Sequence, residues 1–247
     1  MKKFIKIIFV LIILLSITGI IYFSYNIINW NLNVNENKKI KEDQKKLIKV
    51  DNDNKDKYII DFKKLKEINS DTVAYIKVNN TNIDYSVVRG KDNSYYLNHN
   101  FNKEYNIAGW IFADYNNKFD GTDKNIILYG HDTKDGSMFE TLKYTLNKDW
   151  QDNKDNRIVT LTTEKDTYKY EAFSTYTIKP EDYYINTEFN NDNEFNNFIN
   201  KLKSRSIYDY NVDLTNTKDI LTLSSCYNLG NKRVVLHARK INEEKSE

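Results

Sequence analysis

Three side chains in this 247-residue chain could together carry out acyl transfer, and each stands at the edge of an apolar run. Cys226, the single cysteine, ends the run 221–226, and Arg233 opens the run that continues with Val234. Far upstream, His131 ends the run 126–131. A cysteine thiolate is a nucleophile, a histidine moves protons, and an arginine guanidinium stabilises developing negative charge. This combination predicts a thiolate acyl-transfer site.

Strand periodicity supports that prediction for the cysteine and the arginine. Alternation along 221–226 puts Thr222, Ser224 and Cys226 on one face, which is a polar setting for a thiol. The short connection that precedes Arg233 would make the two runs neighbouring strands, with Arg233 beside Cys226. The alternative for a lone cysteine is a buried structural role. One cysteine also allows no disulfide within the chain.

His131 is the best placed of the three histidines, because it joins an apolar run to a polar loop. We expect His99, in a polar stretch, to be solvated, and His237, in the middle of a strand, to be partly exposed. One cysteine and three scattered histidines lack the spacing of metal ligands, so we predict no metal and no cofactor.

An apolar stretch near the N-terminus predicts a membrane anchor. Residues 4–25 are almost wholly apolar and can span a bilayer, which takes about 20 residues. Three lysines at or near its start place the N-terminus in the cytoplasm and the rest outside the cell. A cleaved signal peptide is the alternative, but 27–30 offers no small-x-small cleavage site. We predict an uncleaved signal anchor, a single transmembrane helix, at 1–30.

The remainder of the chain divides into a stalk and one domain. Residues 31–57 are rich in Asn, Lys, Asp and Glu and predict a membrane-proximal stalk, partly helical around 38–50. The domain, 58–247, opens with a helical face over 58–69 on which Ile59, Phe62, Leu65 and Ile68 recur every three residues. A nearly neutral composition, with a net charge of +2 over the whole chain, gives no reason to expect a nucleic-acid partner.

Short β-type runs dominate the domain. They lie at 73–78, 83–88, 109–113, 125–129, 157–162, 167–178, 219–224 and 233–240. Eight such runs, rich in Val, Ile, Tyr and Thr and separated by Asn, Asp and Gly, predict a mostly β fold that closes as an eight-stranded barrel or forms a sandwich. One amphipathic helix, 193–204, interrupts the series before the cysteine strand.

Several of these segments resemble class B sortases in the order of that family. The run Asn125-Ile-Ile-Leu-Tyr-Gly-His131 and the run Thr222-Leu-Ser-Ser-Cys226 followed by Arg233 carry the resemblance. Supporting segments are Val88-Arg-Gly-Lys-Asp-Asn-Ser-Tyr-Tyr-Leu97 and Ile111-Phe-Ala-Asp-Tyr115. The similarity covers about 58–241. Ser225 stands where the family usually has Thr, which keeps the hydroxyl, and Ser86 stands where it often has Pro.

The resemblance implies a fold and an activity. The fold is the eight-stranded sortase β-barrel with an N-terminal helix and a late helix. The activity is that of a Gram-positive cell-surface transpeptidase, which cleaves the C-terminal sorting signal of secreted proteins after a threonine and passes the thioacyl intermediate to an amine of a cell-wall peptide or its lipid-linked precursor.

The resemblance also implies roles for individual residues. Cys226 matches the nucleophile, His131 the general acid/base and Arg233 the arginine at the oxyanion and substrate. The residues that match substrate-groove positions are Ser224, Asn93, Leu97, Tyr129, Tyr184 and Ile185. A hydrolase that uses water instead of the amine, and a membrane-anchored binding module with a buried cysteine, remain the alternatives.

Overall fold

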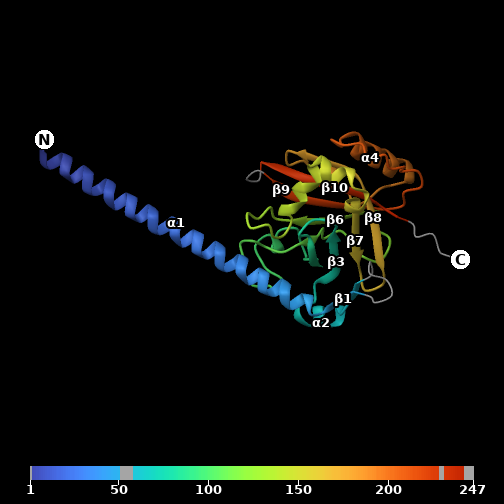
Figure 1. Cartoon of the computed structure of the whole chain (residues 1–247), viewed down its shortest axis with the longest axis horizontal. Helices are drawn as coiled ribbons and strands as arrows, with labels where there is room; N and C mark the ends of the chain where they lie inside the picture. The colour runs from blue at the N-terminus through green and yellow to red at the C-terminus, as the bar shows by residue number, and fades with distance from the viewer. Residues whose placement is uncertain (1, 51–57, 228–230, 242–247) are drawn as a thin grey trace.

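The computed structural model describes residues 2–50, 58–227 and 231–241, with side chains at 3–49, 58–225 and 231–241. A long helix leads into a β-barrel domain (Figure 1). Within the described residues, eight strands close the barrel in the order β10-β8-β7-β3-β4-β5-β6-β9. The predicted mostly β, eight-stranded barrel is therefore confirmed.

The barrel strands are short, and each contributes to one buried core. Their bounds are β3 Thr72–Val78, β4 Asp84–Val88, β5 Phe112–Ala113, β6 Asn125–Gly130, β7 Ile158–Thr162, β8 Thr167–Ile178, β9 Ile220–Tyr227 and β10 Lys232–Lys240. Most neighbours pair antiparallel, but β6 pairs parallel with β9, and β4 with β5. A parallel pair aligns the same ends of two strands, so the C-terminal ends of β6 and β9 lie at the same edge of the barrel.

Short helices connect the strands. The 3₁₀ helices are η1 Tyr95–Leu97, η2 Glu140–Leu146, η3 Lys154–Arg157 and η4 Tyr183–Ile185. A short α-helix, α3, spans Lys148–Asp152. The late helix α4, Asp192–Ser204, begins at Asn191, whose side chain accepts a hydrogen bond from the Glu194 amide. Its apolar face buries Phe195, Ile199 and Leu202.

The start of the domain differs from the predicted helix over 58–69. Tyr58–Ile60 forms a strand, β2, which pairs with β1, Ile48–Val50. Helix α2 is Phe62–Ile68, because the Asp61 carboxylate accepts the Lys64 amide and so starts the helix there. Phe62 and Leu65 are buried as expected, whereas Ile59 and Ile68 are more than half exposed.

Helix α1, Lys2–Lys45, is longer than the predicted anchor and continues without a break into the predicted stalk as far as Lys45. Its N-terminal part is apolar and exposed and is long enough to span a membrane. Its C-terminal part lies against the barrel domain (Figure 1), where Val34, Asn37 and Gln44 are buried. The Asn37 side chain donates to the Gly109 carbonyl at 3.0 Å.

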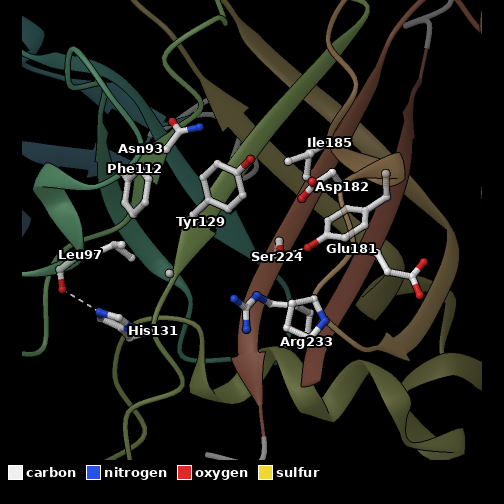
Figure 2. A pocket seen from close by; sticks show the side chains of 13 residues that line it. Asn93, Leu97, Phe112, Tyr129, His131, Glu181, Asp182, Ile185, Ser224 and Arg233 are labelled. Carbon is white, nitrogen blue, oxygen red and sulfur yellow. Dashed lines mark hydrogen bonds between the residues drawn. The ribbon is translucent and has the colours of Figure 1, made fainter. Parts of the chain in front are cut away.

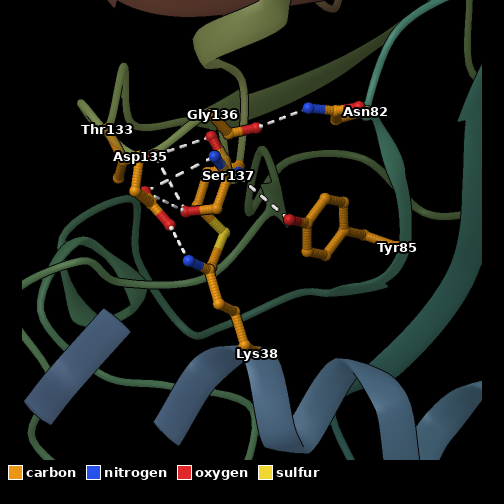
Figure 3. A network of polar contacts seen from close by, with 8 residues as sticks. Lys38, Asn82, Tyr85, Thr133, Asp135, Gly136 and Ser137 are labelled. Carbon is orange, nitrogen blue, oxygen red and sulfur yellow. Dashed lines mark hydrogen bonds and ion pairs between the residues drawn. The ribbon is translucent and has the colours of Figure 1, made fainter. Parts of the chain in front are cut away.

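Polar contacts tie α1 to the loop that follows β6 (Figure 3). Lys38 Nζ lies 3.2 Å from an Asp135 carboxylate oxygen. The same carboxylate accepts the Ser137 hydroxyl at 2.8 Å, and the Thr133 hydroxyl donates to the Ser137 carbonyl at 2.6 Å. Burial opposes ionisation of Asp135, but these partners together hold its pKa below the usual range. These contacts tether the loop that begins with His131 to α1.

Candidate active site

Strand register aligns the backbones of the three residues predicted to do chemistry. The parallel β6–β9 pair places Gly130 opposite Ser225, so His131, the first residue after β6, follows in register with Cys226, which still belongs to β9. On the other side, the antiparallel β9–β10 pair places Arg233 opposite Cys226. Neighbouring strands lie about 4.8 Å apart, so the cysteine backbone stands between those of the histidine and the arginine. The cysteine side chain lies outside the described side chains.

A cavity of about 260 Å³ opens at this end of the barrel. Figure 2 shows its lining side chains, which come from the segment after β4, from β5 and β6, from the η4 region and from β9 and β10. The lining comprises Asn93, Leu97, Phe112, Tyr129, Gly130, His131, Pro180, Glu181, Asp182, Tyr184, Ile185, Ser224 and Arg233. The eight predicted site residues whose side chains are described all lie around this one cavity.

His131 is half-buried, and its tautomer follows from one contact. Its Nε2 lies 2.7 Å from the Leu97 carbonyl oxygen (Figure 2). A carbonyl oxygen only accepts hydrogen bonds, so Nε2 carries the proton. Nδ1 is then the ring nitrogen that can take up a proton when the imidazole is neutral. Leu97 therefore acts on the histidine through its main chain, a role that sequence reasoning about side chains did not foresee.

Arg233 is the second residue of β10, and its side chain lines the cavity. Figure 2 shows its guanidinium extending across β9 toward the side where His131 lies. Its Nη1 also donates to the Lys232 carbonyl at 3.4 Å. A guanidinium has five N–H donors and no acceptor, so at this position it can stabilise an oxyanion but cannot act as a base.

The opposite wall is formed by η4 and the polar face of β9. Tyr184 is buried, and its hydroxyl lies 2.9 Å from the Ser224 hydroxyl oxygen. Ile185, half-buried, adds an apolar surface beside them. The serine predicted to line the groove is thus held by the tyrosine predicted for the groove wall.

The third wall carries Asn93 and Tyr129, and both donate hydrogen bonds to Asp114. The Asn93 amide lies 2.8 Å and the Tyr129 hydroxyl 2.9 Å from the same carboxylate oxygen. Burial, followed by the nearby Asp114 charge, raises the pKa of the Tyr129 phenol, so this hydroxyl remains a donor. Asp114 lies in the run 111–115 that resembles class B sortases, but no role was predicted for it; an acidic residue at a strand end was the available signal.

Beneath the site, His237 is fully buried, contrary to the expectation of partial exposure. Its Nδ1 lies 2.9 Å from the Thr222 hydroxyl and its Nε2 2.9 Å from the Tyr176 hydroxyl. Burial lowers the pKa of the imidazole to about 3, so the ring is neutral. His99 is half-buried rather than solvated, stacked on Tyr95 with ring centroids 4.0 Å apart. Neither histidine lines the cavity.

No group of three or more His, Cys, Asp or Glu side chains that could hold a metal ion occurs among the described residues.

Comparison with known proteins connects this arrangement to one family. The sortase domain model matches residues 76–241. Sortase B of Listeria monocytogenes is 38% identical over 166 residues, which is 67% of each chain. Sortase B of Staphylococcus aureus is 31% identical over 245 residues, which is 98% of each chain. The crystal structure of sortase B from B. anthracis is 32% identical, covers 86% of this chain and 99% of its own, and superposes with a TM-score of 0.75.

Proposed function

This chain belongs to the sortase family as a class B cysteine transpeptidase, and we propose that it cleaves sorting signals after threonine and joins the released carbonyl to a cell-wall amine. The observation that carries the proposal is the register of β6, β9 and β10, which aligns His131, Cys226 and Arg233. The cavity that His131 and Arg233 line is large enough to accept part of an extended peptide.

We assign the first half-reaction to these residues. The Cys226 thiolate attacks the threonine carbonyl carbon, and the carbonyl oxygen becomes an oxyanion. N–H groups of Arg233 donate to that oxygen. When the intermediate collapses, the C–N bond breaks and the leaving amine takes a proton from the His131 imidazolium. A thioacyl enzyme remains.

The second half-reaction reverses these roles with a different amine. The incoming amine attacks the thioacyl carbonyl, gives its proton to His131 and expels the Cys226 thiolate, which leaves a new amide bond. Water in place of the amine would give hydrolysis from the same intermediate. The substrate groove that we assign consists of Ser224, Asn93, Leu97, Tyr129, Tyr184 and Ile185, all around the cavity.

Peptide cleavage by the full chain in a mild detergent tests the assignment. Peptides that contain Asn-Pro-x-Thr-Asn or Pro-x-Thr-Gly are incubated with and without triglycine, and the products are identified by mass spectrometry. We expect the wild type to yield a threonine–triglycine product and Cys226→Ala to yield none, since no covalent intermediate can form. An unchanged melting temperature shows that the variant is folded. Cleavage by folded Cys226→Ala would refute the nucleophile, and a product that is only hydrolysed would favour the hydrolase.

We further propose that the apolar part of α1 anchors the enzyme in the cell membrane, with the N-terminus in the cytoplasm and the domain outside. The length and exposure of this helix and the lysines at its start support the proposal. Intact-mass analysis of the membrane fraction should find residues 1–30 still attached. A shortened form released into the medium would contradict it.

A further inference from the structure

The wall of the cavity that carries Asn93 and Tyr129 rests on one buried carboxylate. Asp114 directly follows β5 and is only 2% exposed. One carboxylate oxygen, Oδ2, accepts the Asn93 amide at 2.8 Å and the Tyr129 hydroxyl at 2.9 Å. The other, Oδ1, accepts the main-chain and side-chain N–H groups of Asn116 at 2.9 and 3.0 Å. Asp114 is therefore buried as an acceptor of four hydrogen bonds.

The chemistry of these partners makes the carboxylate difficult to replace. Every partner supplies an N–H or O–H, and an ionised carboxylate is a pure acceptor. An amide at the same position would turn its NH₂ group toward donors in either orientation. A buried donor without an acceptor is costly, so the partners would have to move.

Asn93 shows what the carboxylate fixes. While its Nδ2 donates to Asp114, its Oδ1 accepts the Tyr115 main-chain N–H at 3.0 Å. The amide plane is therefore fixed at both ends. Tyr129 belongs to β6, two residues before His131, so the same carboxylate joins the segment after β4 to the strand that presents the histidine.

We propose that Asp114 is a positioning residue for the sorting signal, which orients the Asn93 amide and the Tyr129 ring in the groove. The inference rests on the proposed function, because it assumes that this cavity binds the peptide. Asp114 does not line the cavity, so it acts through its two partners and not by contact with the peptide. Its loss should weaken peptide binding and leave the reactivity of the nucleophile unchanged.

The test compares Asp114→Asn with the wild type and with a matched control, Asp120→Asn. Asp120 lies on an exposed loop, and its carboxylate accepts hydrogen bonds from the main-chain N–H and the hydroxyl of Thr122. Loss of hydrogen bonds to a charged group should lower kcat/KM about 10- to 100-fold, through KM rather than kcat. The rate of Cys226 alkylation by iodoacetamide should stay at the wild-type value, as should every parameter of Asp120→Asn. A double-mutant cycle with Tyr129→Phe should be strongly non-additive, because both changes remove the same contact.

Wild-type KM in Asp114→Asn, additive effects in the cycle, or a fall in kcat and alkylation at constant KM would each overturn the inference. If Asp114→Asn does not fold, Asp114→Ser replaces it, since a hydroxyl removes the carboxylate without placing an amide against donors; a folded serine variant with wild-type KM would also overturn it. Wild-type cleavage is measured in the same series. A failure of the proposed function therefore appears in the wild type, and a failure of this inference only in the variants.

Discussion

Acid should destabilise this domain through a histidine that takes no part in the reaction. His237 is fully buried, and burial lowers the pKa of its imidazole to about 3. In the unfolded chain the pKa returns to the ordinary value of about 6.5. Between pH 6.5 and pH 3 the imidazole is protonated in the unfolded state but not in the folded state. The free energy of unfolding therefore falls as the pH is lowered from 6.5 toward 3.

The size of the effect follows from these two pKa values. Each pH unit between them costs about 1.4 kcal/mol, and integration from pH 7.5 to pH 4.5 gives a loss of about 2–3 kcal/mol. Carboxylates also titrate in this range, so the loss must be separated from theirs. His237→Gln provides the separation, because a glutamine does not titrate but can still hydrogen-bond to the Thr222 and Tyr176 hydroxyls.

Urea unfolding of the full chain in a mild detergent, followed by fluorescence of the buried tryptophans, measures the free energy of unfolding at both pH values. The wild type should lose about 2–3 kcal/mol more than His237→Gln between pH 7.5 and pH 4.5. The glutamine variant can be less stable at both pH values without affecting this comparison. Equal pH dependence in the two proteins would show that the histidine does not titrate as its burial requires.

Two further substitutions test the site and the fold. Arg233→Lys keeps the charge but loses the planar fork of donors, so kcat in the peptide assay should fall about 100- to 1000-fold; near wild-type turnover would show that only the charge is needed. Gly109→Ala should lower the free energy of unfolding by more than about 2 kcal/mol, because at φ +60° a Cβ would lie 2.5 Å from the main-chain oxygen of Tyr96 in η1. Gly121→Ala is its control: φ is also positive, but no atom lies within 4 Å, and a loss equal to that of Gly109→Ala would refute the steric argument.

The strands were predictable from local pattern, but the way they close was not. Short runs rich in Val, Ile, Tyr and Thr, separated by Asn, Asp and Gly, located every barrel strand approximately, since β-branched and aromatic residues favour strands and the separating residues favour turns. β5 has only two residues, Phe112–Ala113, where a run of five was expected. The order of strands around the barrel depends on contacts between segments far apart in the chain, and local periodicity does not encode them.

Tertiary contacts also explain where local reasoning failed. The Asn-rich part of α1 has weak helix propensity, yet Asn33 and Asn37 bind the loop that contains Gly109, and this docking favours an unbroken helix. His237 was expected to be partly exposed because it lies in the middle of a strand. Its two ring nitrogens instead find hydroxyl partners inside the domain, which makes a buried position possible.

Site residues were easier to find by their chemistry than by their supports. Cys226, His131 and Arg233 stand out because few residue types can act as nucleophile, proton carrier and oxyanion donor. Asp114 and the Leu97 carbonyl act on other groups of the protein, and a chain with 35 acidic residues and a carbonyl at every position gives no sign of which of them do so.

Because α1 is one continuous helix, its length fixes the rotation of the barrel about the helix axis relative to the apolar part. The helix has no Pro or Gly between its apolar part and the residues docked on the barrel, so nothing in that segment favours a kink, and a rotation of one part turns the other with it. One residue inserted after Ile28 would turn the barrel about 100° around the helix axis and raise it by about 1.5 Å. Four inserted residues would nearly restore the original heading about 6 Å higher. With α1 anchored in the membrane as proposed, the number of residues in the helix therefore sets the direction in which the cavity faces along the membrane surface.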